Sequence, residues 1–149
     1  GCFTKWDELE FFLMLRKVKL LNRTPIFTCV PDVVADAEET NKRWHKYHDM
    51  IDFQKAFVVK DGHEPQDIPK QAFAVFVGGS TDWKLNNSEK FRSVCSWLHI
   101  GRVNSEQRLL WAEEIGADSV DGTGFFRSKP QRQTFKEWFD GRRQTEWVI

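Results

Sequence analysis

Short apolar runs alternate along the chain with longer stretches in which apolar residues recur at helical spacing. Continuous apolar runs bounded by turn residues are typical of buried strands. We predict five strands, at residues 25–31, 56–60, 72–77, 97–100 and 117–121. We predict helices at 7–21, at 33–51, from 87 or 88 to about 95, at 105–115 and, in the tail, at 131–140. Because strands and helices alternate with short connections, the pattern indicates parallel strands joined by right-handed crossovers.

The best-defined helix is the one at 105–115, directly before the fifth strand. Asn104 and Gln107 have the spacing of a capping box at its start. Gly116 suits the left-handed position after its last turn. The strand that follows ends in Asp121 and a glycine turn, and strand ends of this kind are where α/β proteins place catalytic groups.

Small or charged residues follow every predicted strand. Because the carboxyl ends of parallel strands share one edge, we expect these residues to converge there. Crowded carboxylates shift one another's pKa values, glycines let a ligand approach the backbone, and an arginine suits an anionic ligand. We predict Asp121 as the catalytic residue and, as substrate-binding residues, Asp32, Asp61, Gly78, Gly79, Gly101 and Arg102.

Several of these residues have a second, structural interpretation. Asp61 and Asp32 each suit a helix cap or a turn, and the glycine pair suits any tight connection between a strand and a helix. His99 lies inside a predicted strand, which is typical of a core or supporting histidine, and we expect His63 on the surface. Asp118 competes with Asp121, because residues three apart on a strand face opposite sides and only one can point inward. The strand-end position favours Asp121.

Composition narrows the function classes. The 149 residues carry 22 basic and 22 acidic side chains, so there is no overall charge signal for nucleic acid. Segment 127–143 is nevertheless basic, and it is either a solvated helix face or a nucleic-acid contact. The three cysteines form no CxxC pair, which predicts no metal site, no disulfide framework and a reducing cytoplasm. No apolar run approaches the roughly 18 residues of a membrane span, so we expect no membrane partner.

Four segments resemble one known family. They are 76–84 (FVGGSTDWK), 99–105 (HIGRVNS), 116–123 (GADSVDGT) and 30–36 (VPDVVAD). In this order, each at a strand end, they resemble the tRNA-guanine transglycosylase superfamily. The closest likeness is to small phage and bacterial proteins related to the branch that inserts 7-deazaguanines into DNA. The resemblance covers roughly residues 26–123.

The resemblance implies a (β/α)8 barrel of TIM type and exchange of guanine in nucleic acid for a 7-deazaguanine base, without a cofactor. The substrate would be DNA rather than tRNA. In this family an aspartate forms a covalent link to the ribose C1′, and Asp121 matches it. Asp32 matches the aspartate that reads the base edge. Gly78 and Gly79 match the turn that contacts the base, and Gly101 matches a glycine one strand earlier than the nucleophile.

The chain also departs from the family pattern. Segment 1–3 (GCF) resembles the end of a turn that follows the family's general acid, so we expect that acid and the first barrel strands immediately upstream. We therefore expect a single-domain partial barrel of about five β/α units with a helical tail, completed by a second copy or a partner. The zinc site of the tRNA enzymes has no match, because Cys95 is the last cysteine. Two alternatives stay open: a non-catalytic barrel fragment that binds nucleic acid or a protein, and a barrel enzyme acting on a sugar phosphate.

Overall fold

The computed structural model describes residues 6–145, and segment 1–3 lies outside this range. The helices are α1 (Glu8–Leu20), α2 (Ala37–Tyr47), α3 (Thr81–Asn87), α4 (Glu106–Glu114) and α5 (Lys129–Thr145). The strands are β1 (Thr28–Cys29), β2 (Lys55–Val59), β3 (Ala74–Val77), β4 (Trp97–Ile100) and β5 (Ser119–Val120). Four 3₁₀ turns complete the chain: η1 (His48–Met50), η2 (Pro65–Asp67), η3 (Glu89–Val94) and η4 (Gly124–Phe126).

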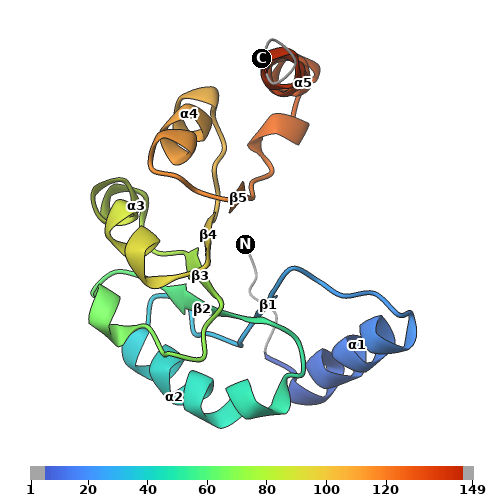
Figure 1. Cartoon of the computed structure of the whole chain (residues 1–149), viewed down its shortest axis with the longest axis vertical. Helices are drawn as coiled ribbons and strands as arrows, with labels where there is room; N and C mark the ends of the chain where they lie inside the picture. Colours follow the sequence, from blue (N-terminus) through green and yellow to red (C-terminus); the bar gives the residue numbers. More distant parts are fainter. Residues whose placement is uncertain (1–5, 146–149) are drawn as a thin grey trace.

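The five strands form one parallel sheet in the order β1-β2-β3-β4-β5. Each strand therefore lies beside its predecessor in the chain, as in consecutive β/α units. The sheet curls into a half-barrel with helices along its outer side (Figure 1). This confirms the predicted α/β class and the parallel strands, and the half-barrel is consistent with the predicted partial barrel.

The strand register divides the sheet into two faces. Val59, Val77 and Ile100 are paired in one row, and each is fully buried against the helices. The neighbouring row faces the inside of the curl and contains Phe76 and His99. A residue's place in this alternation therefore decides whether it packs against a helix or points into the half-barrel.

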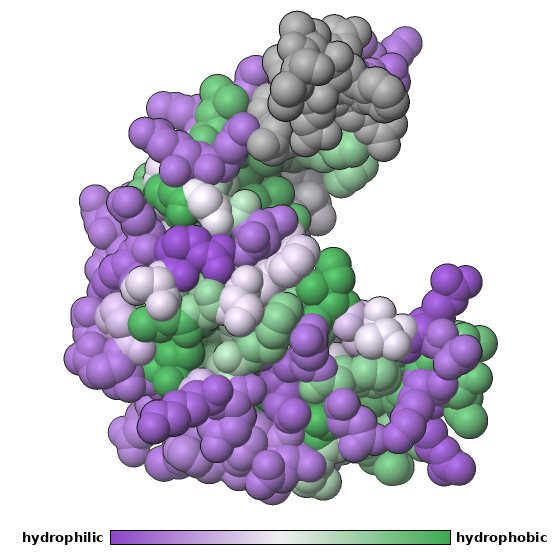
Figure 2. Space-filling view, in the orientation of Figure 1, coloured by the Kyte–Doolittle hydropathy of each residue, from purple (hydrophilic) through white to green (hydrophobic). Residues whose placement is uncertain are grey.

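A contact between side chains at β1 and β4 shows how strongly the sheet curls. The rings of Phe27, just before β1, and His99, on β4, lie 5.6 Å apart between centroids. Three strand spacings separate β1 from β4, which is about 14 Å in a flat sheet. Figure 2 shows the molecule hollowed on the side toward which the sheet curls, with hydrophobic residues along the wall.

The first predicted strand and the second predicted helix were both too long. Segment 25–31 contributes only β1, an edge strand of two half-buried residues, because Pro25 and Pro31 have no N–H for a ladder. The predicted helix at 33–51 begins at Ala37, since Asp36 accepts a hydrogen bond from the N–H of Glu39 at 2.9 Å. We expected this segment to be a strand inside the sheet, buried on both faces, but β1 lies at the edge of the sheet.

Helix α3 and the cap of α4 also differ from the prediction. The helix expected from 87 or 88 to 95 is a 3₁₀ turn, and α3 begins earlier, after the capping Ser80. Ser105 caps α4 in place of Asn104, whose Oδ1 instead accepts from the N–H of Gly124 at 2.8 Å. His63 is buried at 2% exposure, so its expected surface position is wrong.

Candidate functional site

Asp121 lies directly after β5, at the carboxyl edge of the sheet. Its Oδ1 accepts a hydrogen bond from the backbone N–H of Arg102 at 2.7 Å, and its Oδ2 lies 3.1 Å from Nε2 of His99. The Asp121 side chain is 47% exposed, whereas that of His99 is 10% exposed. This carboxylate is held by two neighbours and remains open to solvent, which suits a nucleophile.

The register separates Asp121 from Asp118. Ser119 belongs to the inner row of the sheet, so Asp121 faces inward and Asp118 faces the helices. Asp118 forms an ion pair with Arg92, and its Oδ2 accepts from the N–H of Leu98 at 2.7 Å. Asp118 therefore holds the start of β5 in place, and Asp121 is the acid of the pair that reaches the inner edge.

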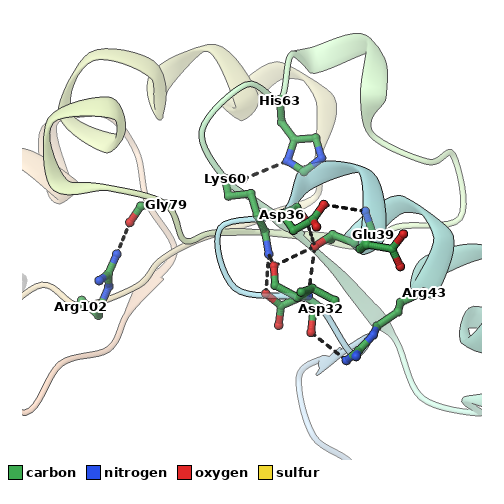
Figure 3. Close-up of polar contacts among 10 residues, drawn as sticks. Asp32, Asp36, Glu39, Arg43, Lys60, His63, Gly79 and Arg102 are labelled. Atoms are coloured by element: carbon green, nitrogen blue, oxygen red, sulfur yellow. Dashed lines mark hydrogen bonds and ion pairs between the residues drawn. The ribbon is translucent and has the colours of Figure 1, made fainter. Parts of the chain in front are cut away.

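Asp32 lies in the loop between β1 and α2 (Figure 3), at the end of the sheet opposite β5. We call the loops after β1 and after β5 the two walls of the site. Its Oδ2 accepts from Nζ of Lys60 at 2.7 Å, and its backbone carbonyl accepts from Arg43 at 3.0 Å. Lys60 follows β2, has a side chain only 4% exposed, and also donates to the carbonyl of Val33. One third of the Asp32 side chain remains exposed, so a buried lysine fixes this carboxylate without covering it.

The thiol of Cys29, at the end of β1, is influenced by acids of both walls. The pKa of its thiol is raised to about 12, first by burial and then by the negative charges of Asp32 and Asp121. These two carboxylates come from the first and last strands of the sheet and act on the same thiol. The curl therefore brings both predicted acids to one side of the half-barrel.

Asp61 has a different environment from the other two acids. Its two carboxylate oxygens accept from the N–H and the hydroxyl of Ser80, each at 2.7 Å. The Ser80 hydroxyl is the main reason that the pKa of Asp61 is lowered from its ordinary value. This carboxylate ties the loop after β2 to the loop after β3, and it supports the glycine turn.

The glycines at the edge are explained largely by close packing. A Cβ on Gly101 would lie 2.8 Å from Cε1 of Phe76, and one on Gly78 would lie 3.2 Å from a backbone oxygen of β2. Gly79 has a φ of +72°, and its carbonyl accepts from the guanidinium of Arg102. Arg102 itself has a φ of 58°, which turns its side chain back toward the glycine turn.

Lys84 is a buried charged residue that we did not predict from the sequence. It lies on α3 and donates from Nζ to the carbonyl of Gly101. Its pKa is lowered to about 8, first by burial and then by the positive charges of Arg102 and Arg108. No local signal marks its inward position, because a lysine is normally exposed and the start of α3 was not predicted.

The rest of the described surface has fewer groups that suit a catalytic or metal-binding site. An open hollow of about 410 Å³ lies between α1 and η1, where the only acid, Asp52, is paired with Lys19. Between residues 6 and 145, no three His, Cys, Asp or Glu side chains are grouped as metal ligands would be. None of the helices in that range combines the length and apolar character that a bilayer span requires.

Comparisons with known proteins return no match: no family model fits the chain, and neither a curated protein nor a solved structure is significantly similar to it. The features that bear on function are therefore the geometry of the strand-end edge and the motifs at each strand end.

Proposed function

We propose that the protein is a base-exchange glycosyltransferase that replaces guanine in nucleic acid, preferably DNA, by a 7-deazaguanine. Asp121 is the nucleophile, and the half-barrel is part of a barrel of TIM type. The observation that carries this proposal is the inward-facing, half-exposed carboxylate of Asp121, held by Arg102 N–H and His99 at the carboxyl edge. The ordered motifs that resemble the transglycosylase superfamily support the choice of reaction.

The reaction requires two displacements at one sugar carbon. An Asp121 oxygen attacks C1′, the C1′–N9 bond breaks, and its electron pair leaves with guanine, which takes up a proton from water; the incoming base later returns a proton to water. The nitrogen of the incoming deazaguanine then attacks C1′, loses its proton, and the ester bond to Asp121 breaks to restore the carboxylate. Because the sugar carbon passes through an oxocarbenium-like state, a carboxylate is a competent nucleophile at each step.

Asp32 is proposed to read the base. Lys60 donates to its Oδ2, and the side chain remains one third exposed. A carboxylate can accept two N–H bonds from a guanine-like edge, which adenine cannot offer in the same arrangement. Lys60 donates to the carboxylate of Asp32 and Arg43 donates to its backbone carbonyl, so both bonds hold the residue in place at the wall opposite Asp121.

Incorporation of a labelled deazaguanine tests this function. The full chain is incubated with guanine-containing duplex DNA, single-stranded DNA or tRNA, and the label in the polymer is counted. We expect incorporation with DNA and a loss of about 10⁴-fold in Asp121→Asn, because an amide is a poor nucleophile. Asp82→Asn, on the exposed start of α3, is the matched control and should retain activity. Equal incorporation by wild type and Asp121→Asn would reject the proposal.

A non-catalytic nucleic-acid-binding domain is the second candidate. It is favoured by exposed basic residues where the chain leaves the site, namely Arg127, Lys129 and Arg132 between η4 and the start of α5. In that case binding to DNA would weaken steeply with salt. It would also be the same in wild type and Asp121→Asn, with no label incorporated.

A further inference from the structure

A line of hydrogen bonds crosses the inner face of the half-barrel and ends at Asp121. The indole Nε1 of Trp97 lies 2.7 Å from Oγ of Ser119, and this hydroxyl lies 2.7 Å from Nδ1 of His99. The other imidazole nitrogen, Nε2, lies 3.1 Å from Oδ2 of Asp121. Trp97 and His99 are two apart on β4, and Ser119 is the strand partner of His99, so all three lie on the inner face of the sheet.

The first member of this line determines the direction of every bond in it. An indole N–H can only donate, so Ser119 accepts from Trp97. The Ser119 hydroxyl has one hydrogen, and it lies within hydrogen-bond distance of Nδ1 of His99, which can accept it. Nδ1 is then the unprotonated nitrogen, and Nε2 carries the hydrogen that is donated to Asp121.

The other protonation states of His99 fit these contacts less well. With the hydrogen on Nδ1, a bare Nε2 would face the carboxylate of Asp121, and two acceptors at 3.1 Å repel each other. With hydrogens on both nitrogens, Ser119 would accept from Trp97 and His99 together, and its own hydrogen would lose the Nδ1 acceptor. The neutral form with hydrogen on Nε2 is the one that satisfies all the contacts.

We infer that His99 is a positioning residue for Asp121, held as the neutral Nε2–H tautomer by Trp97 acting through Ser119. The inference rests on the proposed function, in which Asp121 attacks the sugar. Arg102 N–H and His99 Nε2–H donate to different oxygens of Asp121 and fix the plane of the carboxylate. A fixed carboxylate needs less reorganisation to reach the attacking geometry.

A neutral donor suits this reaction better than a cation. The carboxylate of Asp121 loses its negative charge as the ester to C1′ forms. A positively charged imidazolium would stabilise the free carboxylate more than the transition state, and that difference slows the attack. Rings restrict the surroundings of His99, with Phe76 at 4.5 Å and Phe27 at 5.6 Å between centroids, which limits the access of water to the imidazole.

Nitrogen-15 NMR of the histidine rings tests the tautomer without any substrate. In the full-length wild type we expect an unprotonated Nδ1 and a protonated Nε2 for His99. Ser119→Ala and Trp97→Phe should each shift these resonances toward the other tautomer or the cation, because each breaks the line at a different bond. His63 is an internal control, since its Nδ1 accepts from the N–H of Lys60 at 3.0 Å and should stay unprotonated throughout. A protonated Nδ1 in wild-type His99, or resonances unchanged in both variants, overturns the inference.

The rate of adduct formation tests the positioning role. In His99→Gln the side-chain amide places an N–H near the position of Nε2, whereas His99→Leu offers no donor. We expect His99→Leu to lower the single-turnover rate by about 100-fold and His99→Gln to restore most of it. Equal loss in both variants contradicts the role assigned to the Nε2–H donor. If wild type forms no adduct, the proposed function fails whatever the tautomer; if it does and the NMR result is reversed, only this inference fails.

Discussion

Replacing Lys84 by methionine removes a charge buried behind the strand-end edge. Lys84 is 4% exposed, and its Nζ donates to the carbonyl of Gly101. Its pKa falls from 10.5 to about 8, chiefly because of burial. A difference of this size corresponds to roughly 3 kcal/mol of unfavourable free energy for the charged form in the folded protein.

The pKa of Lys84 determines in which pH range this free energy appears. Below pH 8 both states are protonated, and the folded protein carries the full penalty. Between pH 8 and 10.5 the unfolded lysine binds a proton that the folded one does not, so stability rises with pH. Lys84→Met does not show this rise in stability. Near pH 7 the variant gains stability because the buried charge is gone. It also loses about 1–3 kcal/mol because the Gly101 carbonyl no longer has a hydrogen-bond donor.

Urea unfolding of wild type and Lys84→Met from pH 7 to 10.5 measures the effect. We expect the difference in free energy of unfolding to move by roughly 3 kcal/mol in favour of wild type across this range. The titration of Cys29 is common to both proteins and cancels in the difference. Lys42→Met is the control, because Lys42 is exposed and Glu39 and Glu38 raise its pKa above the ordinary value. If the difference in free energy of unfolding between wild type and Lys84→Met stays constant with pH, the charge of Lys84 does not destabilise the folded protein and the reasoning is refuted.

Three further predictions concern the glycine turn and the two walls of the site. Gly79→Ala should lower the free energy of unfolding by about 1–3 kcal/mol, because φ is +72° and the new Cβ would lie 2.5 Å from Oδ1 of Asp61; chemical unfolding checks this. Asp61→Asn should lower the melting temperature at neutral pH. This deficit should shrink as pH falls through the lowered pKa of Asp61, where wild type also loses its carboxylate. Asp32→Asn and Asp121→Asn should each lower the pKa of Cys29 from about 12, which the rate of alkylation as a function of pH measures. An unchanged pKa in either variant would show that the replaced acid does not act on the thiol.

The sequence predicted the elements whose ends carry strong local signals. Strand β4 matches the prediction, because the apolar run at 97–100 meets Gly101 at its end. Strand β1 and helix α3 were misjudged for physical reasons that only the assembled sheet reveals. Two prolines shorten β1 at the sheet edge, and the polar residues at 81–87 form a helix because Ser80 caps them and Lys84 is buried beneath.

The site was predictable in outline but not in its partners. Strand-end position alone marked Asp121 and Asp32, and the negative charges of both raise the pKa of the Cys29 thiol. Their roles in a reaction stay predictions. The choice between Asp121 and Asp118 needed the register of β5 against β4, which no sequence pattern specifies. The bond between Asp32 and Lys60 joins residues 28 apart, so it depends on tertiary packing and not on local sequence.

Covalent capture at Asp121 is the most direct test of the central proposal. The full chain is mixed with guanine-containing DNA without an incoming base, denatured and digested, and fragment masses then locate any attached sugar between Asp118 and Asp121. We expect a deoxyribosyl ester on Asp121, unchanged yield in Asp82→Asn and no adduct in Asp121→Asn. A sugar attached at Asp118 or elsewhere, or no adduct in wild type under conditions where DNA is bound, would contradict the proposed nucleophile.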